Sequence, residues 1–353
     1  MAAPLVNTEA GLAAILPLLA TPTRIAIDTE ADSLHCYFEK LCLIQISASG
    51  EDLLVDPLAG FPLEPLFEAL TGKELIFHGA DYDLRLLRRV GYGGPHRIFD
   101  TMIGARLCGV TEFSLAALIE RYFGVKLAKA SQKANWALRP LPPEMADYAV
   151  KDTHYLHELA DIFSADLQRL GRQEWFEQSC ERAIRLTEIT KERDSDEVWR
   201  ITGSGLLRGR PAAILRELWR WRDEEARAVD RPAFHILHNE QLLYAADRIA
   251  QGVPTGFHHL RGSRLRRFEE AVDRALDMPE TDWPVIVRTA RPRPTKEEEA
   301  QFKILKQKRD KVAGDLQLDP SLIAPKATLE FIVSNPEEGA AKLMPWQRQL
   351  LGL

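Results

Sequence analysis

The chain has few cysteines and no long apolar segment. Its four cysteines, at positions 36, 42, 108 and 180, include no C-x-x-C pair. Neither a zinc site nor a disulfide framework is therefore indicated. No apolar run approaches the roughly 18 residues that a membrane-spanning helix needs, and the first residues (MAAPLVNTEAGLAAIL) lack the basic region of a secretory signal. We therefore expect a cytoplasmic protein with reduced thiols.

The composition has no strong bias either. The 353 residues are 45% hydrophobic and 28% charged, which is ordinary for a globular protein and excludes disordered, collagen-like and coiled-coil classes. The chain exceeds the roughly 100–200 residues of a single domain, so we expect two or three domains.

Charge is unevenly distributed along the chain. Residues 1–199 contain 20 Lys and Arg against 30 Asp and Glu, a net charge of -10. Residues 200–295 contain 17 against 13, a net charge of +4, and all 17 cations are arginine; residues 296–353 contain nine of each sign. An acidic module therefore precedes an arginine-rich one. Guanidinium groups suit phosphate recognition, although a solvated basic face explains the charge equally well.

The first half of the chain alternates strand and helix patterns. Short spacings between its first strands predict antiparallel hairpins, and strand–helix–strand order further on predicts parallel crossovers. The expected fold is α/β, a mixed sheet flanked by helices and followed by a helical region. The expected strands span 24–28, 41–47, 52–56, 74–78 and 98–99, and the expected helices span 61–70, 81–90, 101–107, 114–123 and 144–170.

The second half is helical and contains an internal repeat. Arg222, Ala226 and Leu242 recur 87 residues later as Arg309, Ala313 and Leu329, and Pro232 recurs 88 residues later as Pro320. Such a period predicts a duplicated small helical unit. Residues 288–296 (RTARPRPTK) are typical of a linker between the copies.

Two acidic residues follow one another at the end of the first core strand. Asp28 and Glu30 are two residues apart, so in a strand both carboxylates point to one face while Ile25 and Ile27 point to the other. Neighbouring buried carboxylates repel each other unless a cation compensates. Oxygen ligands of this kind favour Mg²⁺ or Mn²⁺. The alternative is a strand end at which both acids reach water.

Further acids occur on two predicted helices. Asp81 and Asp83 both fall in the first turn of the helix after the strand ELIFH, and the apolar stripe beside Asp83 favours it only slightly. Tyr148 and Asp152 share one face of a later helix at a spacing of four. Four converging carboxylates can hold two metal ions roughly 3.5–4 Å apart, an arrangement suited to phosphodiester hydrolysis.

These motifs resemble a known enzyme family. DTEAD (28–32), HGADYDLRLL (78–87) and YAVKD (148–152) are similar to the three exonuclease motifs of the DEDD superfamily, and their arrangement is most similar to that of the ribonuclease D family. The resemblance implies a ribonuclease H-like fold and favours Asp83 over Asp81. The histidine-bearing branch would have a histidine at position 147, which is Asp147 here, so the tyrosine-bearing branch is indicated. By resemblance, the metal ligands are Asp28, Glu30, Asp83 and Asp152, with Tyr148 as the fifth catalytic residue.

The resemblance extends to the helical half. The expected exonuclease domain spans residues 1–199. Residues 207–285 resemble the helicase-and-ribonuclease-D C-terminal (HRDC) domain, and residues 296–353 resemble a second, weaker copy of it. SQKANWALRPL (131–141) resembles a further family stretch, with Ala134 and Asn135 in place of Ser and Asp. That departure leaves the metal ligands untouched and puts some substrate contacts in doubt.

The expected function is a metal-dependent 3′-5′ exoribonuclease that uses two Mg²⁺ or Mn²⁺ ions and releases nucleoside 5′-monophosphates. By resemblance its substrates are precursor tRNA and other small structured RNAs, held by the helical domains, and we expect a monomer with no membrane partner. A DNA 3′-5′ exonuclease would use the same metal site. The other alternative is a non-catalytic RNA-binding protein.

Overall fold

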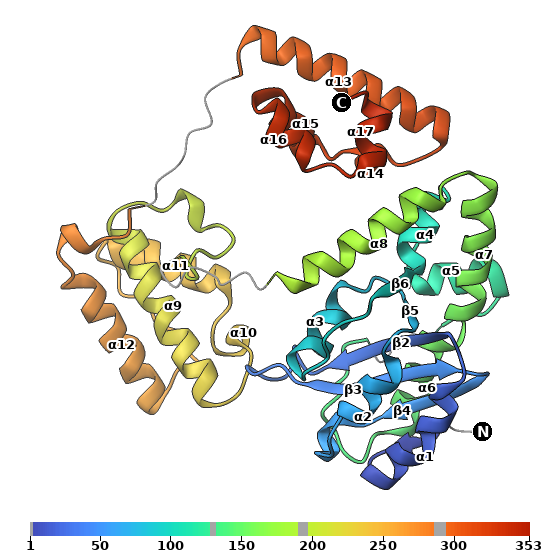
Figure 1. Cartoon of the computed structure of the whole chain (residues 1–353). Coiled ribbons are helices and arrows are strands. Elements are labelled where there is room, and N and C mark those ends of the chain that lie inside the picture. The colour runs from blue at the N-terminus through green and yellow to red at the C-terminus, as the bar shows by residue number, and fades with distance from the viewer. Residues whose placement is uncertain (1–2, 128–131, 190–196, 286–293) are drawn as a thin grey trace. The chain divides into compact units, whose positions relative to one another are not determined.

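The computed structural model describes residues 3–127, 132–189, 197–285 and 294–353 (Figure 1). The chain divides into two compact units. The first contains Met1–Ala31, Leu41–Thr190 and Pro292–Leu353, and the second contains Asp32–Lys40 and Lys191–Arg291. No helix among the described residues is long and apolar enough to cross a membrane.

A six-stranded mixed sheet forms the core of the first unit. Its order is β1-β4-β3-β2-β5-β6. The β2–β3 and β3–β4 pairs are antiparallel, whereas β1–β4, β2–β5 and β5–β6 are parallel, which confirms the predicted mixed sheet. The short edge strand β1 was not predicted. The strands are β1 (Leu5–Val6), β2 (Arg24–Ala31), β3 (Leu41–Ala48), β4 (Glu51–Val55), β5 (Glu74–Phe77) and β6 (Arg97–Asp100).

Helices cover this sheet and supply several of its active-site candidates. Helix α6 packs against β2, β3 and β4, and α7 packs against β2 and β5. Helix α5, predicted over 114–123, is capped by Ser114, whose Oγ accepts from Ala117 N at 3.3 Å, and it ends at Gly124 with φ 69°. The helices are α1 (Glu9–Ala20), α2 (Glu64–Leu70), α3 (Asp81–Arg89), α4 (Thr101–Leu107), α5 (Leu115–Phe123), α6 (Pro143–His154), α7 (Leu156–Arg169) and α8 (Gln173–Glu188).

The prediction of one long helix over 144–170 is wrong. The helix is broken at Tyr155, where φ is -96° and ψ is 0°, and α7 starts afresh. Side chains on both sides of the break are held by the hairpin of β3 and β4. His154 Nδ1 lies 2.6 Å from Asp52 Oδ2, and His157 Nε2 lies 2.9 Å from the Ser47 carbonyl oxygen. The break therefore separates α6, with Asp152, from the helix that follows.

The second unit consists of helices and one segment from between β2 and β3. Trp221 and Phe268 pack edge to face in its core. Within the segment Asp32–Lys40, the Tyr37 hydroxyl donates to Asp223 at 2.8 Å, and the amides of Tyr37 and Phe38 donate to Asp230 at 3.0 Å. The helices are α9 (Arg210–Ala228), α10 (Ala233–Ile236), α11 (Asn239–Ala250) and α12 (Gly262–Leu276); the chain also has 3₁₀ turns at Pro57–Ala59, Ser204–Leu206 and Glu280–Asp282.

The last helices belong to the first unit and share a structural detail with α9 and α10. Arg222 Nη1 donates to the Leu237 carbonyl at 2.9 Å, and Arg309 Nη1 donates to the Ala324 carbonyl at 2.8 Å. In each case the acceptor lies fifteen residues after the arginine in the sequence. Both arginines are buried. The helices are α13 (Lys296–Leu316), α14 (Pro320–Ile323), α15 (Lys326–Ser334), α16 (Pro336–Ala341) and α17 (Pro345–Leu351). The linker predicted at 288–296 lies mostly outside the described residues.

Candidate active site and metal centre

Strand β2 presents two carboxylates from the middle of the sheet. It lies between β3 and β5, so its apolar residues Ile25 and Ile27 are fully buried. Asp28 and Glu30 are two residues apart and partly exposed. The β2–β3 register shifts between Glu30 and Ala31, and such irregularities often lie beside active sites because they redirect a side chain.

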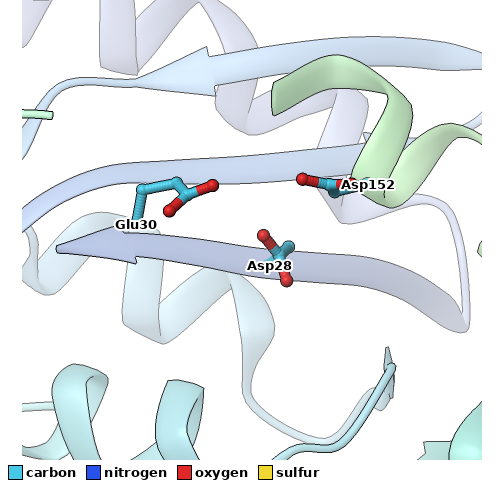
Figure 2. A group of neighbouring side chains, drawn as sticks. All are labelled: Asp28, Glu30 and Asp152. Carbon is cyan, nitrogen blue, oxygen red and sulfur yellow. The ribbon is translucent and has the colours of Figure 1, made fainter. Parts of the chain in front are cut away.

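Helix α6 brings a third carboxylate to the same place. Figure 2 shows Asp152, carried by α6, directed toward Asp28 and Glu30 on β2. Carboxylate oxygens of these three residues all lie within 4.8 Å of one another. An all-oxygen donor set at this spacing fits a hard divalent cation such as Mg²⁺ or Mn²⁺.

Asp83 reaches β2 through a different contact. Its Oδ1 accepts from the Thr29 hydroxyl at 2.6 Å and from the Thr29 backbone amide at 3.0 Å. Asp83 is buried, with 6% of its surface exposed, and it is not one of the three residues that lie within 4.8 Å of one another. The structure therefore places the fourth predicted ligand against β2, tied to the residue between Asp28 and Glu30.

Asp81 has a different environment from Asp83. Both its oxygens accept from Arg85, at 3.0 and 3.1 Å, in an ion pair one helical turn apart. Its side chain is 64% exposed. Sequence periodicity hardly separated these two acids, whereas burial separates them clearly.

The carboxyl groups of the site resist ionising together. Loss of hydration is the main cause, and it raises the pKa of Glu30 to about 9, of Asp152 to about 7 and of Asp83 to about 6. The pKa of Asp28 is raised well above its usual range by loss of hydration and then by the charges of Asp83, Asp152 and Glu30. Bound cations would favour the ionised forms, so the electrostatics agree with a metal centre.

Tyr148 lies one turn before Asp152 on α6. It is half-buried, and its ring lies 6.1 Å from that of Trp136, centroid to centroid. Loss of hydration and then the charge of Asp152 raise the pKa of its phenol, while its hydrogen bond to Asp152 lowers the pKa of that carboxyl. Tyr148 therefore stays neutral and can act as a hydrogen-bonding group, not as a base.

Sequence analysis did not identify two supporting residues. Thr29 lies inside the first motif, but its contact with Asp83 spans 54 positions and has no local signal. Asp100, the last residue of β6, accepts from the amides of Gly79 and Ala80 at 3.0 and 2.9 Å, which fixes the turn before α3. The position of Asp100 between a predicted strand and a predicted helix was the sequence signal that could have identified it as a capping residue. Asp100 also caps α4 through the amides of Met102 and Ile103.

The loop that follows α5 is anchored beside this site. Arg139 forms a two-point ion pair with Asp56, with both N···O distances 2.6 Å, and donates to the Cys42 carbonyl at 2.7 Å. Trp136 is almost fully buried under α6. Of the two departures, Ala134 packs against the cluster that contains Trp136, and Asn135 Oδ1 accepts from the Ala137 amide at 3.1 Å. Ser131 lies outside the described residues.

Comparisons with known proteins match both halves of the chain. The 3′-5′ exonuclease family matches residues 4–168, and the HRDC domain family matches residues 212–254. Ribonuclease D of Nitrobacter hamburgensis is 26% identical, covering 99% of this chain and 93% of that protein, and ribonuclease D of Xanthomonas oryzae is 29% identical, covering 94% and 92%. A 34% identical ribonuclease D from Zymomonas mobilis covers 68% of this chain and 62% of its own length.

Solved structures give the same fold. Escherichia coli RNase D, described as an exoribonuclease involved in structured RNA processing, has a TM-score of 0.74 and 24% identity and covers 100% of this chain and 97% of its own. A protein from Bifidobacterium adolescentis has a TM-score of 0.83 and 23% identity, covering 99% and 95%. The predicted exonuclease fold and one HRDC domain are thereby confirmed, whereas the second HRDC copy rests on the internal repeat and on the matching contacts of Arg222 and Arg309.

Proposed function

Since the chain belongs to the ribonuclease D family of 3′-5′ exoribonucleases, we propose that it removes nucleoside 5′-monophosphates one at a time from RNA 3′ ends with the help of two divalent metal ions. The observation that carries this proposal is the convergence of Asp28, Glu30 and Asp152 from a strand and a helix, with Asp83 tied to the same strand.

Each of the five residues has a proposed role. Asp28, Glu30, Asp83 and Asp152 would hold Mg²⁺ or Mn²⁺, which when bound supply a nucleophile at neutral pH and stabilise the leaving 3′ oxygen. Tyr148, a neutral phenol bonded to Asp152, would orient the attacking water. Since the tyrosine keeps its proton, it acts by position and not by proton transfer.

We also propose the division of labour within the chain. Residues 1–199 form the exonuclease domain, and residues 207–285 and 296–353 form two HRDC-like domains that hold the body of precursor tRNA or another small structured RNA. The protein would act as a monomer in the cytoplasm. Phosphate contact and shape are the recognition modes that suit structured RNA.

The cations of the two helical domains differ in whether acidic neighbours already pair with them. Eight arginines of the segment 200–295 form ion pairs, among them three that share Glu217. On α13, by contrast, Lys303, Lys306, Lys308 and Lys311 are exposed and form no ion pair with any residue that the structure describes. Asp310, the acid among them, pairs with Arg309 at 2.6 Å. The lysine face of α13 is thus free to approach phosphates.

A time course on a 5′-labelled tRNA-like RNA with a 3′ extension tests the proposal. With Mg²⁺ or Mn²⁺, we expect a ladder that shortens from the 3′ end and stalls near the structured stem, and no shortening in EDTA. Intact RNA in both metals, with binding still seen by mobility shift, would contradict hydrolysis. A matched DNA strand distinguishes a ribonuclease from a DNA exonuclease, because RNA should be shortened faster.

A further inference from the structure

Gln45 is the polar exception in the middle of a buried strand. All eight residues of β3 are buried, and the sequence around Gln45 (LCLIQIS) is otherwise apolar up to Ser47. Gln45 itself is 0% exposed. A long amide at the centre of a sheet core is costly to bury, because it leaves water for surroundings that offer few hydrogen bonds.

The strand register places the Gln45 side chain on the carboxylate face of the sheet. Gln45 pairs directly with Asp28 of β2, and residues opposite each other in an antiparallel pair share a face. On its other side it pairs with Leu54 of β4, and Leu43 lies two residues earlier on the same face. Both leucines pack with Met145 and Ala149 of α6. Gln45 therefore lies beneath α6, the helix that carries Asp152.

Neither polar atom of this amide has a partner within the described chain. The Gln45 Nε2 and Oε1 atoms are both buried and form no hydrogen bond there. A buried amide left unsatisfied destabilises a fold, so its presence calls for an explanation, and a role in a neighbouring site is one. A leucine of similar size would suit this apolar layer better. Because its polar atoms are buried, Gln45 is also unsuited to direct contact with RNA.

We propose that Gln45 is a positioning residue of the metal centre: its amide, unpartnered in the metal-free chain, would donate to the Asp28 carboxylate across the β2–β3 pair once a cation is bound. The amide offers two N–H donors, and Asp28 is the carboxylate in register with it. Groups of this kind hold a ligand in the geometry that a cation requires, and their loss typically costs 10–100-fold in metal affinity or activity. This inference rests on the proposed metal-dependent hydrolysis.

The test compares Q45L and Q45M with the unchanged full-length protein. In EDTA, both variants should melt ~2–8 °C higher, because removing an unsatisfied buried amide relieves its desolvation cost. Mn²⁺ binding, followed by electron paramagnetic resonance, should weaken roughly 10-fold or more, and kcat on a short RNA should fall ~10–100-fold. The KM for RNA should change less than twofold. A purely structural role for Gln45 would not raise stability while lowering metal affinity.

I46V is the matched control, since Ile46 is the next residue on β3, fully buried, with its side chain on the opposite face. It should melt lower and bind Mn²⁺ as the unchanged protein does. Wild-type Mn²⁺ affinity in both Gln45 variants, or a lower melting temperature in both, would overturn the proposal for Gln45. If the unchanged protein itself bound no Mn²⁺, the proposed metal-dependent function would fail instead, and D28N provides the reference for a disrupted site.

Discussion

Replacing Thr29 with valine should impair the site by releasing Asp83. The Thr29 hydroxyl donates to Asp83 Oδ1 at 2.6 Å in a buried setting, and valine keeps the shape of the side chain but cannot donate. A hydrogen bond to a charged group contributes about 1.5–3 kcal/mol. Since 1.36 kcal/mol corresponds to a factor of ten, we expect T29V to lower kcat/KM roughly 10–100-fold. The backbone amide of residue 29 still donates to Asp83 at 3.0 Å, which favours the lower end of this range.

The same substitution should change the pH dependence. Loss of hydration raises the pKa of Asp83 to about 6 even though the hydroxyl bond of Thr29 lowers it. Without that bond the pKa of Asp83 rises further, so protons compete with metal up to a higher pH. We expect the acid limb of kcat/KM and of Mn²⁺ affinity to move upward by about one pH unit.

T29S is the control, because serine retains the hydroxyl and should keep both activity and the pH profile close to those of the unchanged protein. The measurement is kcat/KM on a short RNA between pH 5.5 and 9 at fixed Mn²⁺. Coincident pH profiles for T29V and T29S, or equal losses in both, would show that the hydroxyl does not support Asp83 in the working enzyme.

Further predictions concern the carboxylates and the lysine face. D28N should abolish hydrolysis while RNA binding in EDTA stays within twofold; parallel loss of both would contradict separate binding and cleavage sites. D83N should lower activity at least 100-fold, whereas D81N, which removes only an exposed ion pair, should change it less than twofold; similar losses would refute the distinction drawn from burial. Between about pH 4 and pH 9 the site carboxyls of the folded metal-free protein bind more protons than they do in the unfolded chain, because their pKa values are raised. Their contribution should make the melting temperature in EDTA fall as pH rises, and an equal fall in D28N would assign the slope to other groups. K303Q/K311Q should lower the salt slope of log Kd for RNA by ~1.4–1.8 if each lysine contacts one phosphate, and an unchanged slope would place the contacts elsewhere.

Much of the fold and site could be predicted because the signals are local. Ser114 and Gly124 mark the ends of α5 through their own cap geometry, and a spacing of two in a strand or four in a helix puts acids on one face. Local patterns were sufficient for these directions, because each side chain's direction depends on its own strand or helix. That Asp152 of α6 lies beside Asp28 and Glu30 of β2 is a contact between distant segments, which the spacing alone does not contain.

The features that sequence reasoning missed depend on contacts between distant segments. The break at Tyr155 follows from ties between the ends of two helices and the β3–β4 hairpin, which no helical periodicity contains. The Thr29–Asp83 bond likewise needs β2 and α3 side by side. The role proposed for Gln45 depends on its full burial and on its register with Asp28, and both emerge only once β3 is paired.

The segment Asp32–Lys40 constrains how this protein can be divided. The segment connects β2 to β3, yet it belongs to the second compact unit. There Tyr37 forms hydrogen bonds with Asp223 of α9 and with Asp230, which follows α9. The chain therefore passes between the two units at four points, after residues 31, 40, 190 and 291, and not through a single linker. A fragment that ends after α8 would lack Asp223 and Asp230, the hydrogen-bond partners of Tyr37. Its nine-residue segment Asp32–Lys40 would then have lost these contacts directly after the strand that carries Asp28 and Glu30. Removing the HRDC domain therefore also changes the surroundings of the segment that directly follows β2, the strand of the proposed active site.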